Sequence, residues 1–254
     1  MYKASTEYHV PGAEILGKDI AHNEIVIAID DLLLSDVFVA NIDEAMNHYD
    51  VRSTYTTEMG RTLALAYDKN VARNVIKAAR GSALFTGDQG GSAITDADSD
   101  SNAASLAGSI WTAKQTMEEK DVNVDTTDVN AVLKPAQWYL LAQDPTLIMN
   151  KDVDGDGSFS QGKFELIGGV KVSKSNALPW GTNDSANTAI PTANRIDMAT
   201  TTAAVFTEAA AATVQLMGMG MESEYDIRRQ GTLMVAKYAM GHGVLRPEAA
   251  VLIG

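Results

Sequence analysis

The feature that most constrains the fold of this chain is a long helical pattern in its first third. Residues 43–80 are predicted to form a helix, because Asn41 or Asp43 can cap its start and Arg80-Gly81 supplies a cation and a helix-stopping glycine. The apolar positions that recur at every fourth residue form a drifting stripe: Met59, Leu63, Tyr67, Val71 and Val75. A helix of roughly 30 residues is about 45 Å long, so we expect an extended, flattened subunit.

The first 35 residues are predicted to form a long hairpin that has no core of its own. Residues 24–30 are β-branched and apolar, as in a strand, and Pro11-Gly12 is a turn signal that places the tip near residues 8–16. A two-stranded hairpin alone is marginally stable in water. We therefore expect this hairpin to lie on another surface, such as that of a neighbouring subunit.

The rest of the chain mixes strands, helices and two long polar loops. Helices are predicted after Asn102, where apolar residues share one face, and from Pro135, a residue suited to the first helical position. The predicted strands are 36–40, 131–134, 204–206, 213–221 and 232–240, with a hairpin over 147–172 and loops at 82–100 and 180–202. This order of elements indicates a mixed α+β fold. The alternating Met217, Met219 and Met221 are expected to share one face and to belong to the core.

Composition excludes several classes of function. The chain has 33 acidic and 20 basic side chains, a net charge of -13, which repels duplex DNA unless the cations gather on one face. It has no cysteine and therefore no disulfide or thiolate metal site, which suits a reducing compartment. We find no signal peptide and no apolar stretch long enough to span a bilayer, so no membrane partner is expected.

One segment carries a metal-binding pattern. The letters DVDGDG from Asp152 onward match the start of an EF-hand calcium loop. The twelfth position of the loop should supply a bidentate carboxylate, but it is Lys163, and Glu165 comes two residues late. A solvated acidic turn is therefore favoured over a cation site, whose ligands would be Asp152, Asp154 and Asp156.

Catalytic motifs are absent from the sequence. The four histidines are scattered, and no nucleophile elbow, P-loop or dinucleotide-binding fingerprint occurs. We therefore expect a protein that is not an enzyme and that needs no cofactor.

Two long motifs resemble a known family. Residues 41–53 read NIDEAMNHYDVRS and residues 236–250 read AKYAMGHGVLRPEAA, with shorter matches at 7–12 (EYHVPG) and 29–33 (IDDLL). In this order they resemble the major capsid proteins of short-tailed bacteriophages (podovirus-type, Autographivirus-like), marine and cyanobacterial ones included. The resemblance covers most of the chain and is weak in the two long loops.

The resemblance implies an HK97 capsid fold in a subunit of an icosahedral shell. On that basis residues 1–30 would be the E-loop, 31–81 a P-domain strand and the spine helix, 82–202 the A-domain, and 203–254 the return strands of the P-domain. It also implies a virion built of many copies, as pentamers and hexamers around double-stranded DNA, with a scaffolding protein and a portal as partners and assembly in the host bacterial cytoplasm. Family members carry an arm of several dozen residues before the E-loop, which here is either removed, absent or supplied otherwise.

The hairpin tip and a set of C-terminal arginines are the expected contacts between subunits. The first 36 residues hold seven acidic side chains, which could lie over a basic edge of a neighbour. The residues expected to make such contacts are Tyr8, His9, Pro11, Gly12, Arg228, Arg229 and Arg246. Alternatively, the arginines pair within their own subunit or with water. Two other functions stay open, an encapsulin-like compartment and a calcium-binding interaction module.

Overall fold

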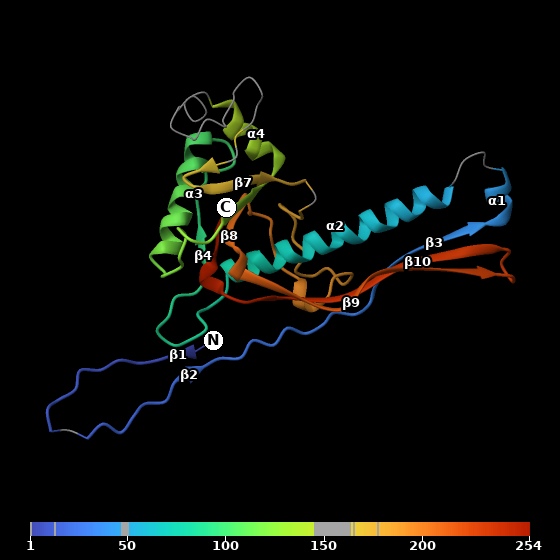
Figure 1. Ribbon diagram of the computed structural model, residues 1–254. Coiled ribbons are helices and arrows are strands. Elements are labelled where there is room, and N and C mark those ends of the chain that lie inside the picture. The colour runs from blue at the N-terminus through green and yellow to red at the C-terminus, as the bar shows by residue number, and fades with distance from the viewer. Residues whose placement is uncertain (1, 13, 47–50, 145–163, 165, 177) are drawn as a thin grey trace.

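The computed structural model describes residues 2–12, 14–46, 51–144, 164, 166–176 and 178–254. A long helix lies across two β-sheets, and a narrow N-terminal hairpin projects from the body (Figure 1). The larger sheets have the strand orders β3-β10-β9 and β4-β11-β8-β5-β7-β6, and β1 and β2 form a third, two-stranded sheet. This mixture of helices and sheets confirms the predicted α+β class.

Helix α2 (Val51–Ala79) is the longest helix among the described residues. Its 29 residues correspond to about 44 Å. A separate helix, α1 (Asn41–Met46), comes before it, so the prediction of one helix starting at residue 43 is wrong. Arg52 near the start of α2 forms an ion pair with Glu44 of α1 at 2.7 Å, and this contact holds the two helices together.

Each end of α2 is buried by a different sheet. Met59 and Leu63 pack in a core with the three-stranded sheet, whereas Val75 and Ile76 pack in a core with the six-stranded sheet. The helix ends as predicted, because the N–H of the glycine at position 81 donates to a carbonyl of the last turn at 2.9 Å. Since neither sheet alone covers its length, α2 joins the two sheets into one subunit.

The three-stranded sheet consists of β3 (Leu33–Ala40), β10 (Gly231–Val244) and β9 (Ala211–Asp226), all antiparallel. β10 is the central strand, and one face of β3 and β10 packs on α2 through Val39, Met234, Ala236 and Tyr238. The strands predicted in these three regions are confirmed, and each is longer than expected.

The methionines of β9 lie outside the core, contrary to the prediction. Met217, Met219 and Met221 are all exposed. β9 is an edge strand, and α2 packs mainly on β10 and β3. Register shifts between Lys237 and Met240 of β10 also interrupt the regular alternation of side chains along β9.

The six-stranded sheet takes its strands from segments that are far apart in the sequence. Across the sheet they are β4 (Ser92–Ile94), β11 (Ala250–Ile253), β8 (Ala203–Thr207), β5 (Val129–Leu133), β7 (Val170–Lys174) and β6 (Leu166–Ile167). β8 pairs with β5, and β11 pairs with both β8 and β4. A division of the chain at residue 202 therefore passes through this sheet.

Helices α3 (Ala103–Glu118) and α4 (Pro135–Gln143) pack with one face of this sheet in a single core. The side chain of Asn102 caps α3 by accepting the N–H of Ala104 at 3.0 Å, and Pro135 is the first residue of α4, as predicted. The predicted apolar face of α3 is buried throughout: Ala103, Leu106, Ala107, Ile110, Ala113 and Met117. The opposite face of the sheet packs on the last turns of α2.

The N-terminal hairpin is confirmed, but the strand predicted at residues 24–30 is wrong, because the second strand of the hairpin lies before that segment. β1 (Tyr2–Lys3) pairs with β2 (Ala21–His22). Residues 24–30 form no strand. They run instead as an extended strap across β10, where a methyl group added at Gly241 would overlap the carbonyl oxygen of Ala28. The β-branched run is therefore extended, as its composition predicts. It lies against β10 at Gly241, and the backbone N–H of Asp30 donates to the carbonyl oxygen of Met240 at 3.2 Å.

The predicted hairpin over 147–172 lies largely outside the described residues. The part that is described is the hairpin β6–β7, which turns at Gly168 and Gly169 with φ of 59° and 80°. The loop predicted over 180–202 is confirmed as largely irregular. Three short 3-10 turns complete the description: η1 (Thr192–Asn194), η2 (Glu208–Ala210) and η3 (Pro247–Ala249).

We predict that Gly241→Ala releases the strap, because the added methyl group requires either the strap or β10 to move. Overpacking of this kind costs about 1–3 kcal/mol. The matched control is Gly220→Ala in the neighbouring strand, where an added methyl group meets nothing within 4 Å. Limited proteolysis should cut residues 24–30 faster in the first variant only, and equal rates in both variants would contradict the packing described here.

Candidate functional site: two exposed arms and their junction

The first exposed arm is the N-terminal hairpin, which its own subunit holds at the base. Lys3 pairs with Asp88, and the side-chain amide of Asn23 donates to the carbonyl oxygen of Leu84 at 2.9 Å. Beyond these contacts the hairpin extends away from the body (Figure 1). Residues 4–12 and 14–20 are exposed throughout.

The tip of this arm carries apolar side chains in full contact with solvent. Tyr8 is fully exposed, Leu16 is 85% exposed, and Val10 and Ile15 are exposed as well. Gly12 has φ of 90°, a left-handed conformation that favours glycine at the turn. The structure therefore brings the four predicted contact residues of the hairpin, Tyr8, His9, Pro11 and Gly12, together at one exposed tip.

The second exposed arm is the ribbon of β9 and β10, which points away from the hairpin (Figure 1). Its turn carries the exposed Arg228 and Arg229. Asp226 organises this turn, since its carboxylate accepts the backbone N–H of Arg228 at 2.8 Å and lies 3.7 Å from the guanidinium of Arg229. The side chain of Arg228 is thus the freer of the two cations at the turn.

Arg246 lies at the other end of the ribbon. The 14 residues of β10, roughly 44 Å, separate it from Arg228 and Arg229. Its guanidinium donates to Glu248 of the same chain at 2.8 Å. The structure therefore does not gather the three arginines on one edge. It shows the intramolecular pairing that was the alternative for Arg246, while a contact of any of these arginines with a neighbour stays a prediction.

One face of the three-stranded sheet is uncovered over half of its length. The strap covers the end near Gly241, but Phe38 and Leu34 of β3 remain exposed on the face opposite α2. Leu233 and Val235 of β10 lie on the same face and are half-buried. This face therefore presents exposed apolar side chains to solvent, next to the charged Asp36 and Lys237 on the same face.

A polar junction joins the strap, α2, the loop before β8 and the ribbon. Asp30 at the end of the strap accepts the side-chain amide of Asn194 at 2.7 Å, and Asn194 accepts that of Asn74 of α2 at 2.8 Å. Asn194 and Asn74 are buried. Lys77, one turn further along α2, donates to the backbone of the same loop. These contacts fix where the hairpin arm leaves the body.

His242 is the titratable group at the centre of this junction. It is buried on β10, with Nδ1 at 3.0 Å from the hydroxyl of Thr213 and its ring edge-on to Tyr67 at 5.2 Å. Burial lowers the pKa of His242, and the carboxylate of Asp30 acts in the opposite direction. Burial also raises the pKa of the neighbouring Tyr238, and Asp30 and Tyr67 add to that effect.

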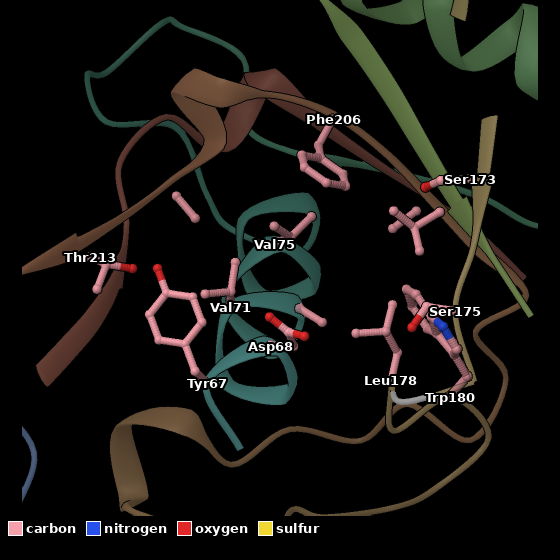
Figure 2. Close-up of a pocket in the computed structure, with 14 residues that line it drawn as sticks. Tyr67, Asp68, Val71, Val75, Ser173, Ser175, Leu178, Trp180, Phe206 and Thr213 are labelled. Atoms are coloured by element: carbon pink, nitrogen blue, oxygen red, sulfur yellow. The ribbon is translucent and has the colours of Figure 1, made fainter. Parts of the chain in front are cut away.

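A cavity of about 540 Å³ lies between α2 and the six-stranded sheet. Figure 2 shows Val71 and Val75 of α2 on one side and Phe206, Leu178 and Trp180 around the rest. Its wall is mainly apolar, and Trp180 Nε1 is buried without a hydrogen-bond partner among the described residues. Of the hydroxyl groups on its wall, that of Thr213 lies 3.0 Å from Nδ1 of His242, a contact that belongs to the polar junction.

The candidate cation ligands Asp152, Asp154 and Asp156 lie outside the described residues. Within the described ranges, no three His, Asp or Glu side chains come close enough together to hold a metal ion. Nor does any helix in those ranges combine the length and apolar character needed to cross a membrane.

Two glycines in β10 are a sequence feature that could have indicated the junction. Glycine inside a strand often marks the close approach of another segment, and Gly241 and Gly243 flank His242. The strap passes over both glycines, and an added methyl group at Gly243 would lie 2.7 Å from Ile27. The polar partners of the junction, Asp30 and Asn194, had no such local signal.

A family model described as Gp10A-like, major capsid protein, matches residues 1–254. The chain belongs to this family. It is 28% identical to the major capsid protein of Escherichia phage T7, over 98% of this chain and 78% of that protein. The capsid structure of the cyanophage P-SCSP1u is 35% identical over the whole of this chain and 81% of that chain, with a TM-score of 0.88.

The fold of this family member is that of HK97-like phage capsids. The mature capsid of bacteriophage PhiM1, 18% identical, covers the whole of this chain and 79% of that chain with a TM-score of 0.83, which shows the shared fold. The predicted family and fold class are confirmed. The family is a structural one.

We predict that His242 makes the subunit less stable in weak acid. Since burial lowers its pKa, the unfolded chain binds a proton at higher pH than the folded chain does. The free energy of unfolding should therefore fall as pH decreases below about 6.5, the ordinary value for histidine. His242→Gln should reduce this fall, as measured by thermal unfolding of dissociated subunits from about pH 7.5 to about pH 5.5. His9→Gln, at the exposed tip, is the control, and an unchanged pH profile in the His242 variant would contradict the assignment.

Proposed function

We propose that many copies of this chain assemble into the icosahedral shell that encloses the double-stranded DNA of a short-tailed phage. The observation that supports this most directly is the match of the whole chain to a major capsid protein family. The surface of the single subunit agrees with it, because the hairpin tip and one sheet face expose apolar side chains that a stable monomer would bury. Shell interfaces would cover both.

The hairpin tip is the arm that reaches a neighbouring subunit. Its base is bound to its own subunit, so the tip can meet apolar surface only on another copy, and Tyr8, His9, Pro11 and Gly12 would make that contact. The exposed Phe38 and Leu34 on the open sheet face offer apolar side chains for that contact. Because the two arms point in different directions (Figure 1), one copy can give its hairpin to a second and receive that of a third.

Charge pairing at the ribbon turn would support the same contact. The hairpin carries the exposed Glu14 and also Glu7, which pairs with Lys18 of the same hairpin, and the exposed Arg228 and Arg229 lie at the far end of the ribbon. Exposed pairs contribute about 0–1 kcal/mol each, but a shell repeats them in every subunit. Arg246 is a weaker candidate, because its guanidinium already binds Glu248.

Within this function, the chain would divide into an E-loop at 1–30, a P-domain strand with the spine helix at 31–81, an A-domain at 82–202 and P-domain return strands at 203–254. The pairing of β8 and β11 with strands of the 82–202 region supports moving both strands to the A-domain. Pentamers and hexamers would form the shell in the host bacterial cytoplasm, with a scaffolding protein and a portal as partners. Net acidic charge suits an inner wall that must release packaged DNA.

The test is to examine particles formed by the chain in its native context by electron microscopy and to measure their nucleic acid. Closed shells that contain genome-length double-stranded DNA are the expected result. Shells that hold a cargo enzyme and no genome would point to the encapsulin-like alternative. A chain that stays a monodisperse monomer in sedimentation at working concentration would contradict assembly altogether.

A further inference from the structure

The body around the six-stranded sheet carries an exposed aromatic side chain near each end of β7. Trp111 of α3 is 58% exposed, and Tyr139 of α4 is 50% exposed. The turn that precedes β7 lies under Trp111, and the last residue of β7, Lys174, lies over Tyr139. In Figure 1, α3 and the end of β7 stand on opposite sides of this body. The two rings therefore mark two separate patches of one subunit, one near each end of β7.

Trp111 is held in place before any partner arrives. A Cβ atom at Gly168 would lie 2.8 Å from the indole, so one side of the ring rests directly on the glycine backbone. Gly168 also has φ of 59°, which a larger residue would adopt with strain. Lys114, one turn along α3, donates to the carbonyl of Gly168 at 3.2 Å. A fixed ring loses little conformational entropy on binding.

The patch at the C-terminal end of β7 presents a cation beside its aromatic ring. Lys174 Nζ lies 3.7 Å from the ring centre of Trp138 and 4.3 Å from that of Tyr139, and donates to the Tyr139 hydroxyl at 3.1 Å. Among the residues that the structure describes, Lys174 has no carboxylate partner. The two rings thus hold the ammonium group of Lys174 in place, and no described carboxylate neutralises its charge.

The surface around Trp111 carries acidic side chains together with Lys114, whose amine is already bound to the carbonyl of Gly168. α3 ends in Glu118 and Glu119, and both are exposed. Glu118 lies two turns after Trp111, on the same face of the helix, and forms no ion pair with another described residue. Lys120, the next cation, turns inward onto a backbone oxygen at 2.5 Å. An aromatic ring with an unpaired acid in one patch thus matches an aromatic ring with an unpaired base in the other patch.

We propose that Trp111 of one subunit packs against Tyr139 of the next, with Glu118 of the first facing Lys174 of the second. Such a contact joins two different patches of the same chain, so it is heterologous and can close into a ring of copies. Tryptophan and tyrosine are enriched among residues that dominate interfaces, and charge pairs fix the register. The proposal rests on the proposed shell function, which supplies the many copies, and adds which surfaces meet.

Charge reversal tests the pairing. Glu118→Lys and Lys174→Glu should each reduce the assembled fraction about tenfold at fixed concentration, as a loss of one charge pair beside a hot spot would. The double variant should recover assembly to within about twofold of the parent, because the pair is restored in reverse. Losses that simply add in the double variant would overturn the pairing. Thermal unfolding of dissociated subunits separates damage to the subunit from loss of the interface.

Cross-linking tests the geometry independently. The chain contains no cysteine, so Gln115→Cys with Ala136→Cys introduces thiols one turn from Trp111 and one turn from Tyr139, both at exposed positions. A short bis-maleimide should give a ladder of linked subunits that stops at closed rings, whereas each single variant should give no ladder. Particles without a ladder would overturn the pairing and leave the shell intact. Failure of the unmodified chain to form particles would overturn the proposed function, and the pairing with it.

Discussion

Helix α2 packs on two different sheets, one near each end, and this packing organises the subunit. Its first half needs the three-stranded sheet and its last turns need the six-stranded sheet, so the two cores share one rigid element. The strap and the ribbon both start from the region where those cores meet, at Asp30, Asn194 and His242. An elongated frame of this kind leaves large surfaces on its outside, which distinguishes it from a compact domain of the same length.

The elongated arrangement around α2 leaves the hairpin tip and one sheet face exposed. The base of the hairpin contacts its own subunit, but the side chains at its tip pack on nothing in the part of that subunit that the structure describes. Phe38, on the open face of the three-stranded sheet, is exposed as well. Each of these surfaces is unfavourable in a monomer and favourable in an assembly, because the burial of apolar area is what stabilises both folds and interfaces. The subunit thus has packed cores of its own, but it exposes apolar surface that contacts with other copies would cover, as a repeating shell requires.

The sequence predicted those helices and turns whose position depends on residues close by in the chain. The cap at Asn102 and the proline at 135 located two helices, and Pro11-Gly12 located the hairpin tip that carries the candidate contact residues. Elements that depend on distant partners were beyond such reasoning. Strand β4 lies in a predicted loop and exists because β11, far along the chain, pairs with it. The methionines of β9 have a core-like pattern, but the strand order places them at an edge.

The same distinction applies to the candidate site. The sequence showed that residues 24–30 are extended but not that they lie across β10, and it grouped Arg246 with Arg228 and Arg229, which β10 in fact separates. Trp111 carries no motif at all, and its position on Gly168 becomes visible only when α3 and β7 are placed together. Contacts between segments are set by packing, so composition and spacing cannot specify them.

The central claim is that apolar surface left open in one subunit is covered by other copies. Hydroxyl-radical footprinting of dissociated subunits and of intact particles measures this directly at Tyr8, Leu16 and Phe38, with the buried Ile110 as an internal reference. We predict that the three exposed side chains react readily in subunits and lose most of their reactivity in particles. Equal reactivity of Tyr8 and Phe38 in both states would contradict the account.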